Sequence, residues 1–278
     1  MKRANKIASF ATIVCLIACA TIYLTANAKQ PSRRTSKPKY TLIMQDDFNG
    51  DSLNSKYWTK MTRNNNVPWK KWQSTHPSLF DVSNGRLRLY GRVNDGIDPS
   101  DTARYILSGI ESQHKVYIKY GKVEVRARMN KVEGCVPAIW MSQEHYLPYP
   151  DYAEIDLVEH IGTSNTISQT VHTNYIDKLG KKDYPKHQVN PTYDVTRYNV
   201  YGIEILPDKL IFTMNGTTTH VYPKIKTSEE GQYPFGLDEM FLKLNIEAGY
   251  NKWLQHVDFD NFPIYMDIDW VKFYKLNE

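Results

Sequence analysis

Cysteine is scarce in this sequence, with 3 residues in 278. Cys15 and Cys19 lie in an apolar stretch near the N-terminus, which leaves Cys135 alone in the rest of the chain. A single cysteine cannot form an internal disulfide, and no cysteine and histidine spacing typical of a zinc site occurs. Because Cys135 begins the apolar run CVPAIW at 135–140, we interpret it as a buried, inert thiol.

An excess of basic residues is also missing from most of the chain. The formal net charge is +5, but residues 1–28 carry three basic residues and no acid, and residues 29–40 carry five and no acid. Residues 41–278 therefore have a net charge of −3. This balance removes the usual electrostatic basis for nucleic-acid binding, so we expect no nucleic-acid partner.

Long amphipathic helical patterns are absent, and short alternating segments are present instead. Residues 120–129 place small or apolar side chains on one face and charged ones on the other. Residues 201–206 and 209–214 flank a Pro-Asp turn, and Asn215-Gly216 follows as a second tight turn. Residues 264–274 form a last strand. This pattern, with 20 Tyr and 6 Trp, predicts an all-β antiparallel sandwich or jelly roll.

The first 28 residues resemble an export signal. A basic start is followed by an apolar run at 7–24 and a small-residue cleavage site, Ala-Asn-Ala, at 26–28. Two alternatives remain open. Residues 16–19 (LIAC) resemble a lipobox, which would attach a lipid to Cys19, and the apolar run is nearly long enough to anchor the chain in a bilayer. Each alternative predicts a secreted, periplasmic or cell-surface protein, with membrane contact only through such an anchor.

The remaining residues divide into a linker and one domain. Residues 29–40 are polar and basic and contain two prolines, which predicts a disordered linker. Residues 41–278 contain no further linker or repeat, so we expect one domain and a monomer.

Three carboxylates occur together in the segment AEIDLVE at 153–159. In a strand, alternate side chains share a face, so Glu154 and Asp156 point one way. Regular alternation would then bury Glu159, and burying an unpaired carboxylate is costly. A β-bulge at Leu157-Val158 would bring Glu159 to the acidic face and leave the two apolar side chains inside.

Three carboxylates on one face repel each other, which indicates function rather than stability. Crowding separates their pKa values, and glycoside hydrolysis by a retaining mechanism needs one ionised and one protonated carboxyl group about 5–5.5 Å apart. The alternative is a solvated acidic strand face without a catalytic role.

The segment also resembles the signature E-[ILV]-D-x-x-E of glycoside hydrolase family sixteen. Further similar stretches follow in the family's order: DDFNG (46–50), SGI (108–110), YGKVEVR (120–126), GCVPAIWM (134–141), YGIE (201–204) and DWVKFY (269–274). Together they cover residues 44–275. The resemblance implies a curved β-jelly-roll sandwich, similar to concanavalin A, with an open substrate cleft across its concave sheet.

By position in the signature, the resemblance makes Glu154 the nucleophile and Glu159 the general acid/base. It places Asp156 between them as a hydrogen-bonding partner. Two positions depart from the family pattern: Ala153 stands where glycine is usual, and Cys135 where tryptophan is frequent. Neither residue carries a proton or a nucleophile, so we expect activity to persist.

Four tryptophans are candidates for stacking against sugar rings. Trp140 occupies the position of a sugar-stacking tryptophan in the family. Trp69 and Trp72 lie in a predicted loop, and Trp253 lies in a similar segment near the end of the chain. A packing role is the alternative for each. Trp58 and Trp270 are interpreted as core residues.

The resemblance also bears on a histidine and a metal. His172 lies on the probable next strand, where the family often has a histidine near the acid/base, with a satisfied sheet histidine as the alternative. Asp269 matches the position of a structural calcium ligand in many members, and hard oxygen ligands suit Ca²⁺. No cofactor is expected for catalysis.

These observations predict a retaining endo-β-glycosidase that acts on a polysaccharide or glycan. Residues 64–73, with Trp-Lys-Lys-Trp, resemble galactan-cleaving members more than laminarin-cleaving ones, which favours a β-galactoside backbone of the agar, porphyran or poly-N-acetyllactosamine type. An endo-β-1,3- or mixed-linkage glucanase is the alternative. A non-catalytic carbohydrate-binding jelly roll is the alternative of another class.

Overall fold

The computed structural model describes residues 39–249 and 254–277. The predicted leader at 1–28, Cys19, nearly all of the linker and Trp253 lie outside these residues. The predicted end of the linker is wrong by two residues. Tyr40 begins the first strand and pairs with Leu276, and its hydroxyl donates to Glu204 at 2.5 Å, while Lys39 also binds that carboxylate. Both residues therefore belong to the folded domain.

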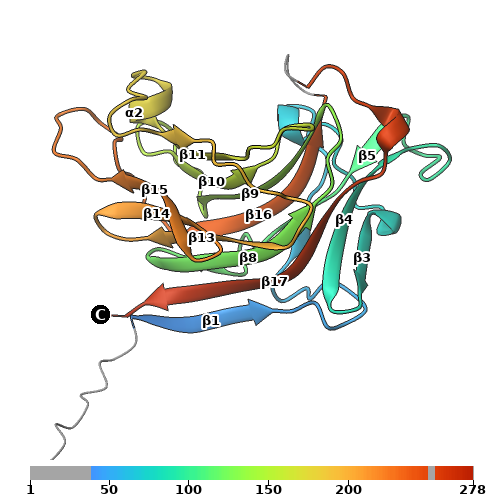
Figure 1. Cartoon of the computed structure of the whole chain (residues 1–278), viewed down its shortest axis with the longest axis horizontal. Helices are drawn as coiled ribbons and strands as arrows, with labels where there is room; N and C mark the ends of the chain where they lie inside the picture. Colours follow the sequence, from blue (N-terminus) through green and yellow to red (C-terminus); the bar gives the residue numbers. More distant parts are fainter. Residues whose placement is uncertain (1–38, 250–253, 278) are drawn as a thin grey trace, which may run out of the picture. The chain divides into compact units, whose positions relative to one another are not determined.

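Two antiparallel sheets form two layers (Figure 1). The first, here the outer sheet, has the order β15-β14-β13-β8-β17-β4-β3, with β1 on β17 and β5 on β4. Its strands are β1 (Tyr40–Asp46), β3 (Phe80–Ser83), β4 (Arg86–Val93), β5 (Tyr105–Leu107), β8 (Gly121–Met129), β13 (Asn199–Ile205), β14 (Lys209–Met214), β15 (Thr217–Pro223) and β17 (Ile264–Leu276).

The second, here the cleft sheet, has the order β12-β11-β10-β9-β16-β6-β2, with β7 on β16. Its strands are β2 (Thr59–Lys60), β6 (Gly109–Glu111), β7 (Tyr117–Ile118), β9 (Cys135–Gln143), β10 (Ala153–Glu159), β11 (Ser168–Thr173), β12 (Gln188–Val189) and β16 (Met240–Ala248). Helical turns are short: η1 (Pro68–Lys70), η2 (Pro77–Leu79), α2 (Asn174–Asp177) and η3 (Phe259–Asn261). The predicted all-β sandwich is confirmed.

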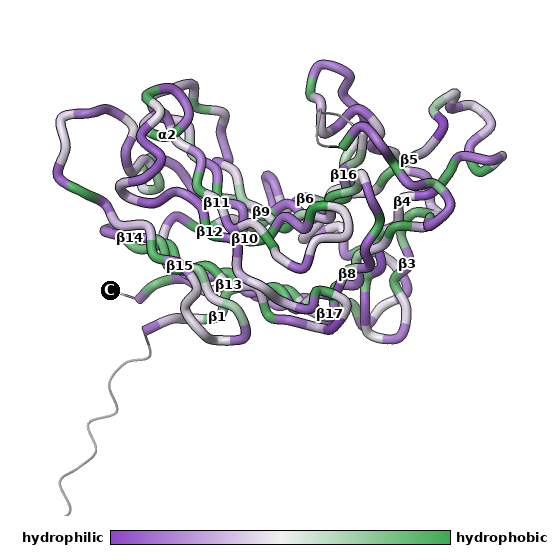
Figure 2. The backbone as a smooth tube through the Cα atoms, turned by 45° about the horizontal axis from the view of Figure 1, so that its top comes forward, coloured by the Kyte–Doolittle hydropathy of each residue, from purple (hydrophilic) through white to green (hydrophobic). Residues whose placement is uncertain are grey.

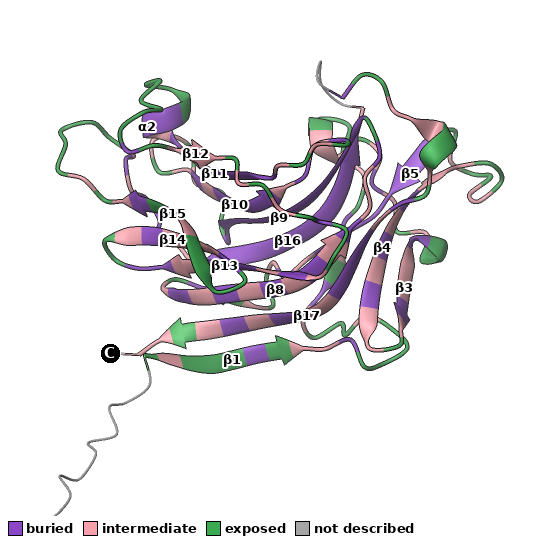
Figure 3. Ribbon diagram, in the orientation of Figure 1, coloured by how far each residue is buried: buried purple, intermediate pink, exposed green. Residues whose placement is uncertain are grey.

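Sequence alternation explains the outer sheet. Along β8 every second residue is buried, and the charged residues between them face out (Figure 3). The hairpin of β13 and β14 is confirmed, and so is the turn after it. Asn215 and Gly216 have φ of 50° and 79°, a left-handed conformation that asparagine and glycine tolerate best. The outer sheet therefore buries one face and exposes the other to solvent.

The cleft sheet differs because its central strands β9 and β16 are buried on both faces. Every residue of β9 and of β16 is buried, as Figure 3 shows for β16. One face packs on the outer sheet around a large apolar core, and hydrophobic residues follow the strands while many loops are hydrophilic (Figure 2). The opposite face carries a second, small cluster of Val136, Ala138, Trp140 and Leu254, with Trp69 and Ile161 packed on it. Polar side chains on this face of the cleft sheet therefore lie next to the small cluster and not in the main core.

The prediction that Trp58 and Trp270 both lie in the core is confirmed for Trp58 and wrong for Trp270. Trp58 is buried, and its Nε1 donates to Asp46 at 2.8 Å. Trp270 instead lies on the outer face of β17, only partly buried, with the Lys272 ammonium 4.4 Å from its ring centre. Within the described residues, no helix is long and apolar enough to cross a membrane.

Candidate active site

The predicted β-bulge is present in β10. On the β9 side, Asp156 pairs with Trp140 and Val158 with Ile139, so two residues of β10 oppose one of β9. On the β11 side, pairing also shifts between Asp156 and Glu159. Leu157 and Val158 are both fully buried. The bulge therefore turns Glu159 to the same face as Glu154 and Asp156.

A buried side chain supports the bulge. Gln169 of β11 donates through Nε2 to the carbonyl oxygen of Leu157 at 3.2 Å. Thr219 in turn donates to Gln169 Oε1 at 2.6 Å. A buried backbone carbonyl without a partner is costly, so this pair of hydrogen bonds compensates for the interrupted ladder.

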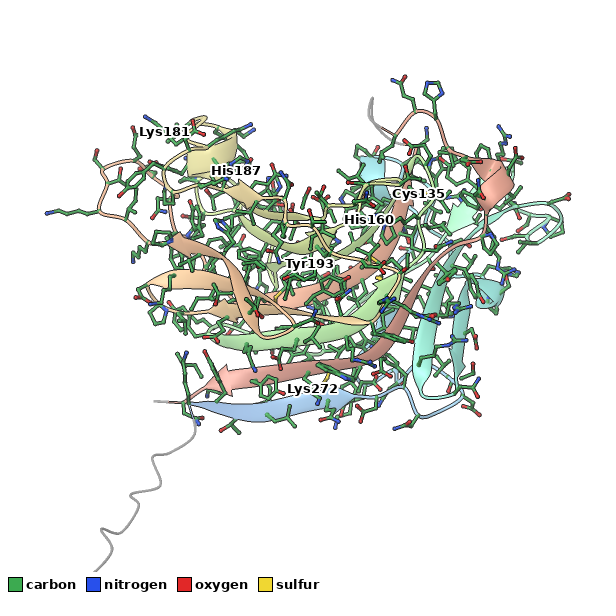
Figure 4. The ribbon with its side chains drawn as sticks, in the orientation of Figure 1. Cys135, His160, Lys181, His187, Tyr193 and Lys272 are labelled. Atoms are coloured by element: carbon green, nitrogen blue, oxygen red, sulfur yellow. The ribbon has the colours of Figure 1, made fainter. Side chains whose placement is uncertain are left out.

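The three acids line one cleft of about 430 Å³. Side chains from β9, β11, β12 and β16 also line it, and so do Lys182 and His187 from the segment after α2. Figure 4 shows His187 and Lys181 beside α2, above the cleft sheet. The structure thus brings together all three carboxylates, Trp69, Trp140 and His172.

Glu154 is half-buried, and part of its surroundings favours its ionised form. Burial and the neighbouring Asp156 raise the pKa of Glu154 to about 7, and His172 and Lys243 oppose that rise. The Tyr152 hydroxyl donates to Glu154 Oε2 at 2.6 Å and opposes it further. A carboxylate that receives a hydrogen bond and faces two cations is suited to act as a nucleophile.

Glu159 lies in different surroundings. Burial, Asp156 and Glu247 raise the pKa of Glu159 well above its ordinary value. Glu247, on β16, accepts a hydrogen bond from Asn245 Nδ2 at 3.0 Å and lines the same cleft. Neighbouring carboxylates disfavour a second negative charge, so Glu159 is suited to hold a proton and to act as an acid.

His172 lies between two carboxylates, one of the three acids and Asp177 of α2. Its Nε2 lies 3.2 Å from Asp156 Oδ2, and its Nδ1 lies 3.2 Å from Asp177 Oδ1. Burial lowers the pKa of His172, but the hydrogen bonds to these two carboxylates raise it to about 11. Tyr149 donates to Asp177 Oδ2 at 2.9 Å. The imidazole is therefore a cation held between two carboxylates.

Metal ligation fits these residues poorly. One ligand atom each of Glu154, Asp156 and His172 lies within 4.8 Å of the others. A metal-binding histidine needs a free ring nitrogen, however, whereas both ring nitrogens of His172 already face carboxylate oxygens at 3.2 Å. At the predicted calcium position, Asp269 binds the guanidinium of Arg126. This ion pair uses Oδ2 of Asp269, and the calcium ligand at this position stays a prediction.

The predicted aromatic residues separate into two groups. Trp140 and Trp69 line the cleft and make an edge-to-face pair with ring centres 4.9 Å apart. Trp140 is fixed by a hydrogen bond from its Nε1 to Asn245 Oδ1 at 2.7 Å. Trp72 instead packs against the core, with its ring centre 5.0 Å from that of Tyr105. The structure favours a packing role for Trp72.

Five polar residues around the acids were not predicted: Tyr149, Tyr152, Asp177, Lys243 and Glu247. A signal for two of them exists in the sequence. In β16, Lys243, Asn245 and Glu247 alternate with apolar residues, which places them on one face of a strand that is buried throughout. Such polar alternation in a buried strand indicates a face that lines a polar cavity.

Three comparisons relate this chain to known proteins. The family model described as "Glycosyl hydrolases family 16" matches residues 69–272. A keratan-sulfate endo-1,4-beta-galactosidase of Sphingobacterium multivorum is 30% identical over 241 residues, which are 85% of this chain and 56% of that protein. A beta-glucanase of Rhodothermus marinus is 30% identical over 191 residues, 64% of this chain and 65% of that protein.

The chain thus spans less than two thirds of the length of these two relatives. Among solved structures, one is described as showing that prominent members of the human gut microbiota express endo-acting O-glycanases to initiate mucin breakdown. It has a TM-score of 0.73 and 28% identity, and the match covers 85% of this chain and 100% of that one.

Proposed function

Because this chain belongs to glycosyl hydrolase family 16, we propose that it is a retaining endo-β-glycosidase. The observation that carries the proposal is the contrast between two carboxylates on one bulged strand. Asp156 and His172 act on both glutamates. In addition, Glu154 accepts a hydrogen bond from Tyr152 and faces Lys243, whereas Glu159 faces Glu247. Retaining hydrolysis needs this pair of a charged nucleophile and a protonated acid.

The reaction follows from these two protonation states. The Glu154 carboxylate attacks the anomeric carbon while Glu159 gives its proton to the glycosidic oxygen, so the leaving sugar departs with a hydroxyl group. Glu159, now ionised, takes a proton from water, and the resulting hydroxide displaces Glu154 from the sugar. Both carboxyl groups return to their starting states, and the mechanism requires no cofactor.

Asp156 and His172 position the reacting carboxylates. Asp156 lies between the two glutamates in sequence and faces the same cleft, where its charge raises the pKa of both. The ion pair with His172 holds that charge in place and opposes its effect on both glutamates, while Tyr152 and Lys243 favour the ionised form of Glu154 alone. The acids therefore differ by their surroundings, although they share one strand.

The proposed substrate is a glycan with internal β-galactosyl bonds. Support comes from the match to a keratan-sulfate endo-1,4-beta-galactosidase and from the stretch 64–73, whose Trp69 lines the cleft. The match to a beta-glucanase supports an endo-β-glucanase as the second candidate. We also propose that the enzyme is monomeric and is exported, through the leader at 1–28 or a lipid on Cys19.

A panel digestion tests this function. The purified enzyme is incubated with keratan, mucin glycans, agarose, porphyran, laminarin and lichenan, and the released oligosaccharides are separated and measured. We expect products from a β-galactan, and products from a glucan alone would refute the galactoside substrate. Glu154→Gln should abolish hydrolysis and retain sugar binding, whereas unchanged hydrolysis would refute the catalytic assignment.

A further inference from the structure

One row of side chains crosses the cleft sheet in register. Asp156 pairs with Trp140, Trp140 with Lys243, and Lys243 with Glu111. Paired residues of an antiparallel sheet project from the same face and lie next to each other. Two charged residues therefore lie on the same face as the catalytic acids of β10, with Lys243 two strands away on β16 and Glu111 three strands away on β6.

These two residues line a second cavity of about 330 Å³ that adjoins the cleft. The two cavities share Trp69, Trp140 and Glu154, but Asp156 and Glu159 line only the cleft. We call the second cavity the Lys243 arm. A nucleophile contacts the sugar whose anomeric carbon it attacks, and the acid contacts the leaving oxygen. An arm that reaches only the nucleophile accordingly accommodates sugars on the glycosyl side of the cleaved bond.

Lys243 is a buried ammonium group with a fixed position. The residue is 8% exposed, and its Nζ donates to Ser142 Oγ at 2.8 Å. Aromatic rings surround it, with the centre of Trp140 at 3.9 Å and that of Trp69 at 5.2 Å. Burial lowers the pKa of Lys243 to about 8. An ammonium group has three N–H donors, and Ser142 is its one hydrogen-bond acceptor among the described residues.

Glu111 supplies the complementary acceptor. Its Oε2 is buried and lacks a hydrogen-bond partner within the described part of the chain. Lys70 Nζ, which lies 5.0 Å from the ring centre of Trp69, is 3.9 Å from that oxygen. The carboxylate of Glu111 thus balances the ammonium charge of Lys243 within the arm. A buried anionic group on the sugar would be repelled by Glu111 and Glu154 together. A neutral polar group avoids that repulsion and can use both the donor and the acceptor.

We propose that Lys243 and Glu111 determine specificity by forming a glycosyl-side subsite for a neutral group with one hydrogen-bond donor and one acceptor. An acetamido group has this chemistry, and so does a pair of adjacent hydroxyl groups. The proposal rests on the retaining endo-glycosidase function and extends it to the sugar next to the cleavage site. Trp69 and Trp140 supply the apolar contact in this subsite, and the charged pair selects the substituent.

The test compares long and short oligosaccharides. The long substrate extends over the arm on the glycosyl side, and the short one ends at the sugar that Glu154 attacks. Two long versions carry either N-acetylglucosamine or glucose in the arm. Wild type, Lys243→Met, Glu111→Gln and the control Lys272→Met are compared by kcat/KM. Lys272 lies on β17 of the outer sheet (Figure 4) and matches the charge change outside the cleft.

We expect Lys243→Met to lower the long-to-short ratio of kcat/KM by about 10- to 100-fold, which corresponds to a lost charged hydrogen bond. Glu111→Gln should lower it less, and Lys272→Met should not change it. If the acetamido group is the ligand, wild type prefers the N-acetylglucosamine version, and the Lys243 and Glu111 variants lose that preference. If adjacent hydroxyl groups are the ligand, wild type cleaves both long versions equally and the variants impair both.

The proposal is overturned if neither variant changes the long-to-short ratio, because general damage to the fold lowers both rates together. Glu111→Gln keeps the side-chain shape, so it tests the subsite even if Lys243→Met does not fold. Failure of the galactoside assignment is separate. In that case the same ratios are measured on long and short forms of the glucan that the enzyme cleaves, and a fall in the ratio still supports the subsite.

Discussion

The hydrogen bond from Tyr152 to Glu154 makes a prediction about the pH dependence of catalysis. A hydroxyl that donates to a carboxylate stabilises its charged form and lowers its pKa. Tyr152→Phe removes that donor and keeps the ring, so the pKa of Glu154 should rise from its value of about 7. Only ionised Glu154 attacks the sugar. The acidic limb of the kcat/KM profile should therefore move to higher pH in the variant.

The size of this shift follows from the strength of the bond. A hydrogen bond to a charged group contributes about 1.5–3 kcal/mol. One pKa unit corresponds to about 1.4 kcal/mol, so the acidic limb should move by about 1–2 units. Well below the limb, kcat/KM falls tenfold for each unit of the shift, which gives a loss of about 10- to 100-fold. At alkaline pH the loss should largely disappear, because Glu154 is then ionised in both proteins.

The assay is kcat/KM against pH for wild type and Tyr152→Phe on one soluble oligosaccharide. Tyr233→Phe is the matched control, because its hydroxyl donates to the backbone oxygen of Leu206 at 2.7 Å and does not line the cleft. The control should leave the acidic limb in place. A loss in Tyr152→Phe that is equal at every pH would refute the reasoning, since the hydroxyl would then act by some route other than the ionisation of Glu154.

Three further predictions follow from the cleft and its supports. Gln169→Leu leaves the Leu157 carbonyl without its donor, so chemical denaturation should show a loss of about 1–3 kcal/mol in the free energy of unfolding, and an unchanged value would contradict the support of the bulge. The raised pKa of His172 contributes stability that is fully present below about pH 6.5 and is lost as pH rises through about 11. Asp177→Asn should move this loss to lower pH, measured by NMR titration of the imidazole and by denaturation, whereas an unshifted imidazole would exclude the ion pair. Trp69→Ala should raise KM, and Trp72→Ala should lower the Tm with little change in KM; the reverse pattern would contradict the placement of the two rings.

The bulge could be predicted from the sequence because it follows from a local cost. Glu159 falls on the wrong face by simple alternation, and an unpaired buried carboxylate is unfavourable, so the two apolar residues before it must share one position. The hairpin of β13 and β14 has the same local origin in turn residues and alternation. These features depend on neighbours in the sequence.

The surroundings of the acids depend on contacts between segments that are far apart in the sequence. The order of the strands in the sheet, which brings these segments together, cannot be read from the sequence pattern. Lys243 faces the arm beside the cleft because β16 pairs with β9, and Asp177 contacts His172 because α2 directly follows β11. Trp69 and Trp72 lie in the same short loop sequence, yet Trp69 packs on the small cluster in the cleft and Trp72 packs on the main core. A short η1 turn separates their directions, and the sequence pattern of this loop contains no period that would show it.

The anomeric configuration of one product tests the central claim most directly. Glu154→Ala removes the proposed nucleophile and keeps Glu159, and azide is small enough to take the place of the missing carboxylate. Azide should restore bond cleavage and produce a glycosyl azide. Attack from the Glu154 side inverts the β-bond once, so NMR should show the α-anomer. A β-glycosyl azide from this variant would place Glu154 on the leaving-group side and contradict the assignment of the two carboxylates.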